Sequence, residues 1–122
     1  MEPLTFKSWL EAYGRAWRDR NPQAAADLFA DDGTYQVTPF LEPMRGRPAI
    51  LDYWSHVART EQDIQFGYEV LAVTPEIGIA RWSASFLIVP TGLPTKLDGI
   101  FLISLAPDGR CKSLMEWWHK QQ

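Results

Sequence analysis

Hydrophobic residues recur at helical spacing near the N-terminus. They follow a period of about 3.6 residues, with charged residues mostly between them, at the positions Phe6, Trp9, Leu10, Tyr13 and Trp17. With Thr5 as a candidate N-cap, this pattern predicts an amphipathic helix whose apolar face packs into a core.

Two further helices are predicted before the middle of the chain. Asn21 supplies an N-cap and Pro22 a favoured first helical position, which predicts a short helix over NPQAAADLFA (21–30). TYQVT (34–38) has the pattern of a short strand or extended segment. The tripeptide GRP (46–48) introduces a third helix, with one apolar face formed by Ile50, Tyr53, Trp54 and Val57.

From about residue 63 onward the pattern is typical of strands. Four long apolar or alternating runs follow one another: IQFGYEVLAV (64–73), IARWSASFLIV (79–89), KLDGIFLISL (96–105) and RCKSLMEWW (110–118). The separators TPEIG, PTGLP and APDG are rich in turn residues, which predicts an antiparallel meander. Three helices followed by this meander predict an α+β fold, with the helices on one face of a curved, mostly antiparallel sheet.

Composition narrows the class of protein. At 122 residues the chain has the length of one domain, covering residues 1–122, and 46% of its residues are hydrophobic. Its net charge of −3 provides no basic stripe, so we expect no nucleic-acid partner and no membrane partner. The single cysteine, Cys111, excludes an internal disulfide, and no signal peptide or membrane span is evident. We therefore expect a soluble, cytoplasmic protein.

The run KLDGIFLISL is apolar at both parities. One face carries Asp98, Ile100 and Leu102. The other face carries Phe101, Ile103 and Leu105, so both faces of this strand are largely hydrophobic. If helices cover one face, the other presents a row of large apolar side chains to solvent. We expect a homodimer formed through the sheet.

Several short motifs resemble the nuclear transport factor two-like superfamily, which includes ketosteroid isomerases and SnoaL-like polyketide cyclases. The motifs are AYGRAW (12–17), LFADDGTY (28–35), GRPAILDYW (46–54) and GRCKSLMEWW (109–118), and the resemblance covers nearly the whole chain. It implies one SnoaL-like, cystatin-like domain shaped as a cone, with three helices on the concave face of the sheet. The superfamily hosts both enzymes and binding modules, so the fold alone does not define a reaction.

The resemblance to ketosteroid isomerases assigns roles to individual positions. Tyr13 falls on the tyrosine and Asp98 on the aspartic acid that donate hydrogen bonds to the substrate oxyanion in those enzymes. The position of the catalytic base falls on Val37, or on Thr38 if the register shifts by one. Neither side chain is a general base at neutral pH, so the chain departs from the isomerase pattern there.

Strand alternation gives a second route to candidate catalytic residues. We expect Asp98 to face the cavity, together with the residues of the same parity on the neighbouring strands: Trp82, Ala84, Phe86, Leu114, Glu116 and Trp118. Two carboxylates in a poorly solvated aromatic cavity push their pKa values apart, leaving one as acid and one as base. Two alternatives stay open: a structural Asp98 that accepts hydrogen bonds near the strand start, and an outward-facing Glu116.

The aromatic content supplies candidate cavity walls. Six Trp, six Phe and four Tyr are either ordinary core residues or a ligand pocket. The candidate ligand-binding residues are Trp17, Tyr53, Trp54, Trp82, Phe86, Trp118 and, at the mouth, His119. For His119 the alternative, a solvated residue near the chain end, is the one we favour. The loop PFLEPMRG (39–46) is a candidate cap over the entrance. His56 and His119 lack metal-ligand spacing and no phosphate-binding glycine loop is present, so we expect neither a metal nor a cofactor.

Two functions remain in competition. The first is a cofactor-independent cyclase, isomerase or dehydratase acting on a small hydrophobic carbonyl or cyclic molecule, with Asp98, Tyr13 and Glu116 as acid, hydrogen-bonding partner and base. The second is a non-catalytic ligand binder or dimeric scaffold, which the absence of a carboxylate at Val37 and Thr38 favours.

Overall fold

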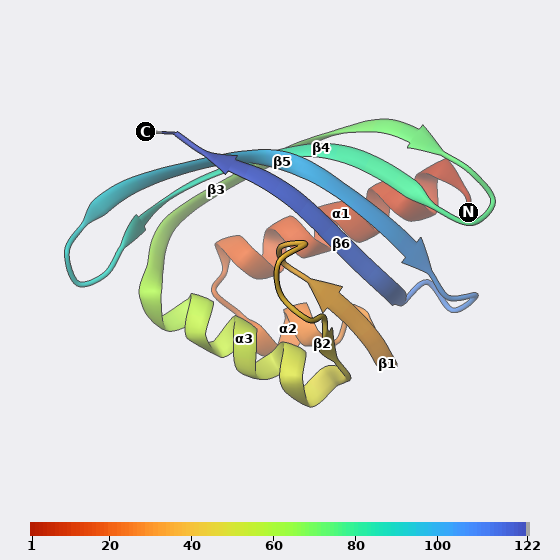
Figure 1. The fold of residues 1–122 in the computed structure, drawn as a ribbon, viewed down its shortest axis with the longest axis horizontal. Helices are drawn as coiled ribbons and strands as arrows, with labels where there is room; N and C mark the ends of the chain where they lie inside the picture. The colour runs from red at the N-terminus through yellow and green to blue at the C-terminus, as the bar shows by residue number, and fades with distance from the viewer. Residues whose placement is uncertain (122) are drawn as a thin grey trace.

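In residues 1–121, which the computed structural model describes, three helices precede or interrupt a six-stranded sheet. The elements are α1 (Pro3–Arg18), α2 (Pro22–Ala26), β1 (Phe29–Gln36), β2 (Met44–Arg45), α3 (Arg47–Thr60), β3 (Glu61–Val73), β4 (Gly78–Ile88), β5 (Leu93–Leu105) and β6 (Cys111–Lys120). The sheet bends into an arch, and the helices lie beneath it on the concave side (Figure 1). The predicted α+β cone is confirmed.

The strand order is β2-β1-β6-β5-β4-β3. Strands β3 to β6 form the predicted antiparallel meander, and β1 joins its β6 edge in parallel. The two-residue strand β2 pairs with β1 where α3 begins. This order places β1, β6, β5 and β4 next to one another in the sheet, and α1 and α3 lie beneath the arch that the sheet forms (Figure 1). Side chains of the helices and of these strands join in one buried cluster.

Two predicted helix boundaries are wrong, and one predicted cap is confirmed. Helix α1 begins at Pro3 rather than after Thr5, because proline suits the first helical position, and its N-cap Glu2 makes no side-chain cap bond. Helix α2 ends at Ala26 instead of reaching Ala30, because Phe29 already begins β1. The predicted Asn21 N-cap is present, with Asn21 Oδ1 accepting a hydrogen bond from the Ala24 amide at 3.1 Å.

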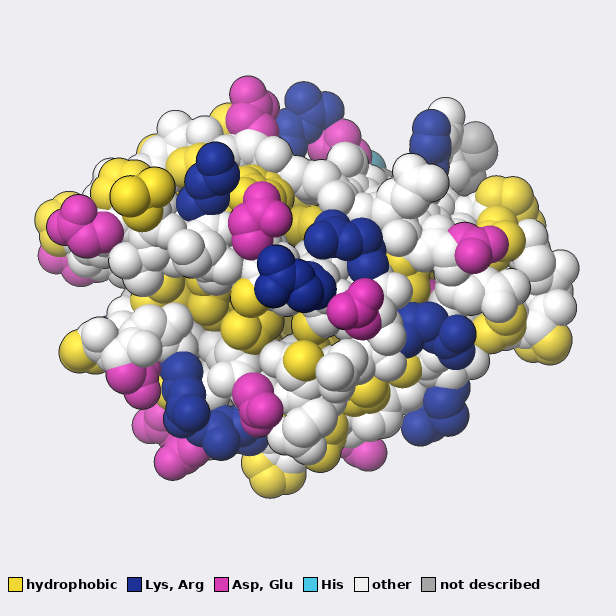
Figure 2. Space-filling view, turned by 180° about the vertical axis from the view of Figure 1, so that it is seen from behind, with side chains coloured by type: hydrophobic (Ala, Val, Ile, Leu, Met, Phe, Trp, Pro, Cys, Tyr) yellow, Lys and Arg dark blue, Asp and Glu magenta, His cyan; other side chains and the backbone are white. Residues whose placement is uncertain are grey.

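Aromatic and aliphatic side chains from all three helices and the sheet form one buried cluster. Phe6 and Leu10 of α1, Ile50 of α3 and Phe101 of β5 are fully buried within it. The exposed face in Figure 2 carries charges of both signs close together, with hydrophobic side chains between them. Within the described residues, no helix combines the length and the hydrophobicity needed to cross a membrane.

Candidate functional site

A cavity of about 120 Å³ lies between the inner face of the sheet and helices α1 and α3. Its lining residues come from these two helices and from every strand except β2, with Val37 just after β1: Tyr13, Trp17, Tyr35, Val37, Tyr53, Trp54, Val57, Glu61, Trp82, Leu97, Glu116 and Trp118. One water molecule takes about 30 Å³ in the liquid. The cavity therefore has room for one small molecule, or for one end of a larger one.

Glu116 is the buried carboxyl group of this cavity. Alternation along β6 turns Leu114 and Glu116 inward, and Glu116 is only 6% exposed. Burial raises the pKa of Glu116 to about 8, although the nearby Tyr35 hydroxyl favours the charged form. At neutral pH the group therefore carries a proton for most of the time and is able to donate it.

Three tyrosine hydroxyls surround the same space. Tyr13 of α1 and Tyr35 of β1 share a hydrogen bond of 3.0 Å between their Oη atoms. Tyr53 of α3 packs against Tyr35, with their ring centroids 5.4 Å apart. Burial, followed by the charge of Glu116, raises the pKa of all three tyrosines, so they stay neutral. The cavity thus holds neutral hydroxyl donors beside a protonated acid.

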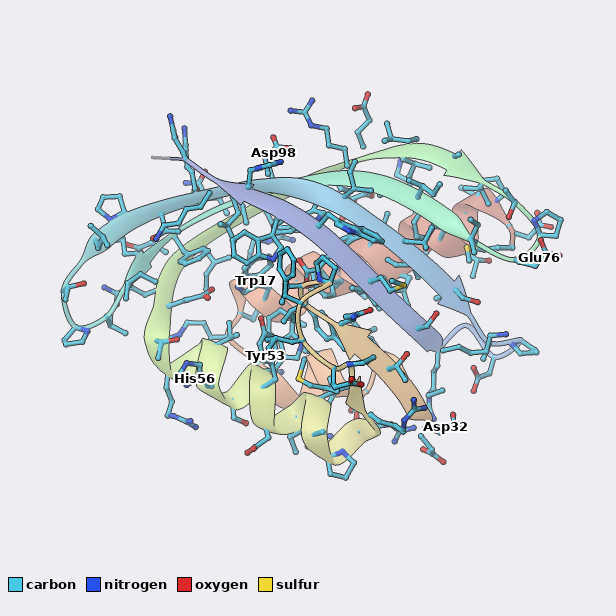
Figure 3. The ribbon with its side chains drawn as sticks, viewed as in Figure 1. Trp17, Asp32, Tyr53, His56, Glu76 and Asp98 are labelled. Atoms are coloured by element: carbon cyan, nitrogen blue, oxygen red, sulfur yellow. The ribbon has the colours of Figure 1, made fainter. Side chains whose placement is uncertain are left out.

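A second carboxyl group, Glu61, lies at the junction of α3 and β3. Trp17 Nε1 donates a hydrogen bond to Glu61 Oε1 at 2.8 Å. Partial burial raises the pKa of Glu61 to about 7, and the hydrogen bond from Trp17 opposes that rise. Figure 3 shows Trp17 and Tyr53 between the sheet and α3, and Glu61 lines the same cavity as these two residues.

Three tryptophans of the lining also bring polar indole N–H groups to the site. Trp118 Nε1 donates to the Val37 carbonyl oxygen at 2.8 Å, which ties β6 to the segment after β1. The Nε1 atoms of Trp54 and Trp82 are buried and have no hydrogen-bond partner among the described residues. Buried polar groups without a partner are uncommon in folded proteins. These two tryptophans therefore add donor groups that the protein leaves unpaired.

Most of the predicted wall residues do line the cavity. The structure brings together Tyr13 and Glu116 with the aromatic residues Trp17, Tyr53, Trp54, Trp82 and Trp118. Phe86 is buried nearby, with its ring centroid 6.1 Å from that of Trp17, but it is outside the lining. The loop 39–46 contributes nothing to the lining, and its Phe40 is 91% exposed, so this loop does not cap the cavity as predicted.

Asp98 does not belong to this site, and its predicted inward orientation is wrong. It lies on the outer face of the sheet, away from Trp17 and Tyr53 (Figure 3). Arg81 Nε and Nη2 donate to its two carboxylate oxygens at 3.1 and 2.9 Å. This bidentate contact holds the pKa of Asp98 below its ordinary value. Asp98 therefore fits the alternative role given above, that of a structural carboxylate, and its hydrogen-bond donor is Arg81.

The orientation of β5 follows the burial of its large side chains: Phe101 and Ile103 are fully buried on the inner face, and Gly99 is buried at the same parity. The inward positions of β5 are therefore Leu97, Gly99 and Phe101, and Asp98 is turned outward. The α-carbon of Gly99 lies so close to β6 that an added Cβ would overlap the Trp117 carbonyl oxygen and lie 2.9 Å from Trp118 Cβ.

His119 also lies outside the cavity. It is exposed and pairs in register with Asp98 on the outer face, so the place at the cavity mouth is wrong and the favoured alternative, a solvated residue, describes it. Both residues line a different and larger hollow of about 710 Å³ on that face, together with polar side chains such as Ser83, Ser85 and Lys96. This outer hollow contains no buried titratable group, so we place the chemistry in the inner cavity.

Tyr35 and Glu61 are cavity residues that the sequence patterns do not single out. Tyr35 lies two positions before Val37, so strand alternation from the base position of the isomerases would have indicated it. Glu61 follows the last residue of α3, where neither helical nor strand periodicity assigns an orientation. In residues 1–121, no group of three or more His, Cys, Asp or Glu is arranged to hold a metal ion.

The fold agrees with comparisons to known proteins. The sequence profile of the SnoaL-like domain matches residues 10–114. The chain belongs to this SnoaL-like family. The resemblance to the nuclear transport factor two-like superfamily is thereby confirmed, whereas curated protein sequences give no match.

Three solved structures with the same fold are distant from this chain in sequence. The epoxide hydrolase/cyclase-like enzyme SalBIII, described in pyran ring formation in polyether salinomycin, is 16% identical, with a TM-score of 0.81 over 93% of this chain and 89% of that one. A putative isomerase from Bacillus subtilis is 18% identical, with a TM-score of 0.81 over 98% of this chain and 90% of the isomerase chain. A hypothetical protein with a ketosteroid isomerase-like fold from Catenulispora acidiphila, in complex with trimethylamine, is 19% identical. Its TM-score is 0.78 over 89% of this chain and 83% of that chain. These likenesses extend to the fold alone.

Proposed function

We propose that this SnoaL-like protein binds a small hydrophobic molecule in the inner cavity and that Glu116 donates a proton to an oxygen atom of that molecule. The observation that carries the proposal is a buried carboxyl group with three neutral tyrosine hydroxyls around one cavity. A general acid is most effective when its pKa lies near the working pH, and that of Glu116 is about 8.

The donors are arranged to stabilise developing negative charge. When a carbonyl is enolised or a cyclic ether is opened, its oxygen gains charge, and fixed donors in a dry site stabilise that charge by several kcal/mol. Tyr13 and Tyr35 are linked through their hydroxyls, so one of them has a proton free for such an oxygen. This supports an isomerase, cyclase or lyase reaction that uses acid and base chemistry without a cofactor.

The test is a binding titration monitored by tryptophan fluorescence. The panel consists of phenols and cyclic enones, and the proteins are the wild type, Glu116→Gln and Asp98→Asn. We expect saturable binding to the wild type and to Asp98→Asn, and at least tenfold weaker binding of at least one compound to Glu116→Gln. Ligands that bind should then be screened for turnover, which Glu116→Gln abolishes.

Two results would contradict this assignment. Equal affinity of the wild type and Glu116→Gln for every compound would remove Glu116 from ligand recognition. Binding that requires Glu116 without turnover of any ligand would favour the alternative function, a non-catalytic binder. That alternative is supported by Val37, which lines the cavity at the position of the isomerase base and cannot accept a proton.

A second candidate ligand is a small amine. The similar protein from Catenulispora acidiphila was crystallised in complex with trimethylamine. An amine of that size suits a cavity of about 120 Å³ in this chain.

We also propose that the protein forms a homodimer through the outer face of the sheet. Ile100 pairs in register with Trp117, and Leu102 pairs with Met115 on β6 and with Ile79 on β4. These five residues, here called the outer apolar patch, point away from the helices, and Trp117 is 42% exposed. A contiguous apolar patch beside the Arg81–Asp98 ion pair supports association with a second copy.

A further inference from the structure

We infer that the inner cavity binds a small ammonium group between Glu61 and Glu116, in exchange for one proton. The inference rests on the proposed function only in taking this cavity as the ligand site. It does not require Glu116 to act on the ligand as an acid. It assigns a role to Glu61 and names a charge class of ligand.

The titratable residues of the lining that are charged when ionised near neutral pH are all acidic. Two of the lining residues are carboxylic acids, and none is Lys, Arg or His. An anionic ligand would meet two acidic groups and no cation, so the cavity disfavours it. A cation would instead compensate a carboxylate that is costly to ionise alone in a buried site.

The carboxyl groups of Glu61 and Glu116 line the same cavity as Tyr13 and Tyr53. Glu116 raises the pKa of Tyr35, Tyr13 and Tyr53, whereas Glu61 raises that of Tyr13 and Tyr53 only. The topology agrees: Glu116 lies on β6, the strand next to β1 with Tyr35, whereas Glu61 lies on β3 at the opposite edge of the sheet and accepts the hydrogen bond from Trp17. A compact ligand beside Tyr13 and Tyr53 would be near both carboxyl groups.

Aromatic rings enclose the cavity on several sides. Tyr13 contacts Trp17 and Trp54 in edge-to-face geometry, with ring centroids 6.1 and 5.4 Å apart. Trp82 and Trp118 close the cavity on the sheet side. Rings grouped in this way recognise quaternary ammonium ions through cation–π interactions, worth about 2 kcal/mol or more when the cation is desolvated.

The exchanged proton comes from one of the two glutamates. The other titratable groups facing the cavity are Tyr13 from α1, Tyr35 from β1 and Tyr53 from α3, and all three stay neutral because burial raises their pKa values. Strands β4 and β5 contribute only Trp82 and Leu97 to the lining. When the cation enters, one carboxylic acid releases H⁺ to water, and the net charge of the cavity is unchanged.

The experiment compares choline with its neutral carbon isostere, 3,3-dimethyl-1-butanol, by isothermal titration calorimetry at pH 6 and pH 9. The pKa values of about 7 and about 8 for Glu61 and Glu116 set these two conditions. We expect choline to bind at least tenfold more tightly at pH 9, and the isostere to show no such rise. At pH 7, titrations in two buffers of different ionisation enthalpy should show proton release on choline binding.

Variants separate this inference from the proposed function. Glu61→Gln should weaken choline binding at pH 9 at least fivefold and leave the isostere unaffected, whereas Asp98→Asn should match the wild type. Equal binding of choline and the isostere, or choline binding independent of pH in the wild type, would overturn the inference. Neither result bears on the response of phenols and enones to Glu116→Gln, so the proposed function is tested independently.

Discussion

The carboxyl group of Glu116 lies where the fold disfavours its charge. It is surrounded by aromatic rings and neutral hydroxyls, with no cation among the lining residues. Asp98 is the opposite case, because it is half exposed and bound by Arg81. Two acids 18 positions apart thus have pKa values shifted in opposite directions, and only the inner one is suited to donating a proton near neutral pH.

Stability should therefore fall as pH rises through the neutral range. The folded state raises the pKa of Glu116 from 4.5 to about 8, so between these values the folded chain binds more protons than the unfolded chain. One such group lowers the free energy of unfolding by about 1.4 kcal/mol per pH unit over that window. Glu116→Gln should remove this dependence and gain stability relative to the wild type from pH 5 to pH 8.

Urea unfolding of both proteins at pH 5, 6, 7 and 8 measures this difference. Glu61 adds a similar dependence up to about pH 7 in both proteins, so the comparison isolates Glu116. Parallel stability curves for the wild type and the variant would show that Glu116 is ionised in the folded state.

At the scale of single elements, the sequence predicts which segments form strands better than which way they face. In β4, polar residues alternate with Trp82, Ala84 and Phe86. This pattern predicts that the three apolar residues face inward, and the structure has them buried. β5 is apolar at both parities, so its pattern fits either orientation. The orientation is set by the burial of Phe101 and Ile103 in the core, a tertiary feature that no local pattern encodes, and it brings Gly99 close to the β6 backbone.

This close approach yields a prediction for two strand glycines. Gly99→Ala forces a methyl group against the β6 backbone, and we expect it to lower the free energy of unfolding by about 1 to 3 kcal/mol. The matched control is Gly67→Ala on β3, where the nearest atom, Ser83 Oγ, lies 3.7 Å from the added Cβ. That change should alter stability by no more than about 1 kcal/mol.

Thermal or chemical unfolding of the two alanine variants decides the point. A Gly99→Ala protein as stable as Gly67→Ala would mean that β5 and β6 are farther apart than the structure has them.

At the scale of the whole molecule, family motifs predicted the cone and much of the cavity, but not its full set of residues. Tyr35 and Glu61 are 26 positions apart in the chain and line one cavity only because β1 and β3 lie on opposite sides of it. Tertiary packing also sets the cavity volume, which depends on how large aromatic side chains fill the cone.

The outer apolar patch carries a prediction about assembly. Ile100→Glu places a charge within this patch, next to Trp117, so we expect it to shift the protein from dimer to monomer in sedimentation velocity. The control is Lys7→Glu on the exposed side of α1, which should leave the dimer intact. A wild-type protein that is monomeric at high micromolar concentration would contradict the dimer through this face.

The most direct test of the central claim, a protonated Glu116 in the cavity, is a carbon-13 NMR titration of the glutamate carboxyl groups. Glu116→Gln identifies the Glu116 resonance by its loss. The structure predicts a midpoint near 8 for Glu116 in the wild type. A midpoint between about 4 and 5, the range of a solvated glutamate, would contradict the proposed acid and the function built on it.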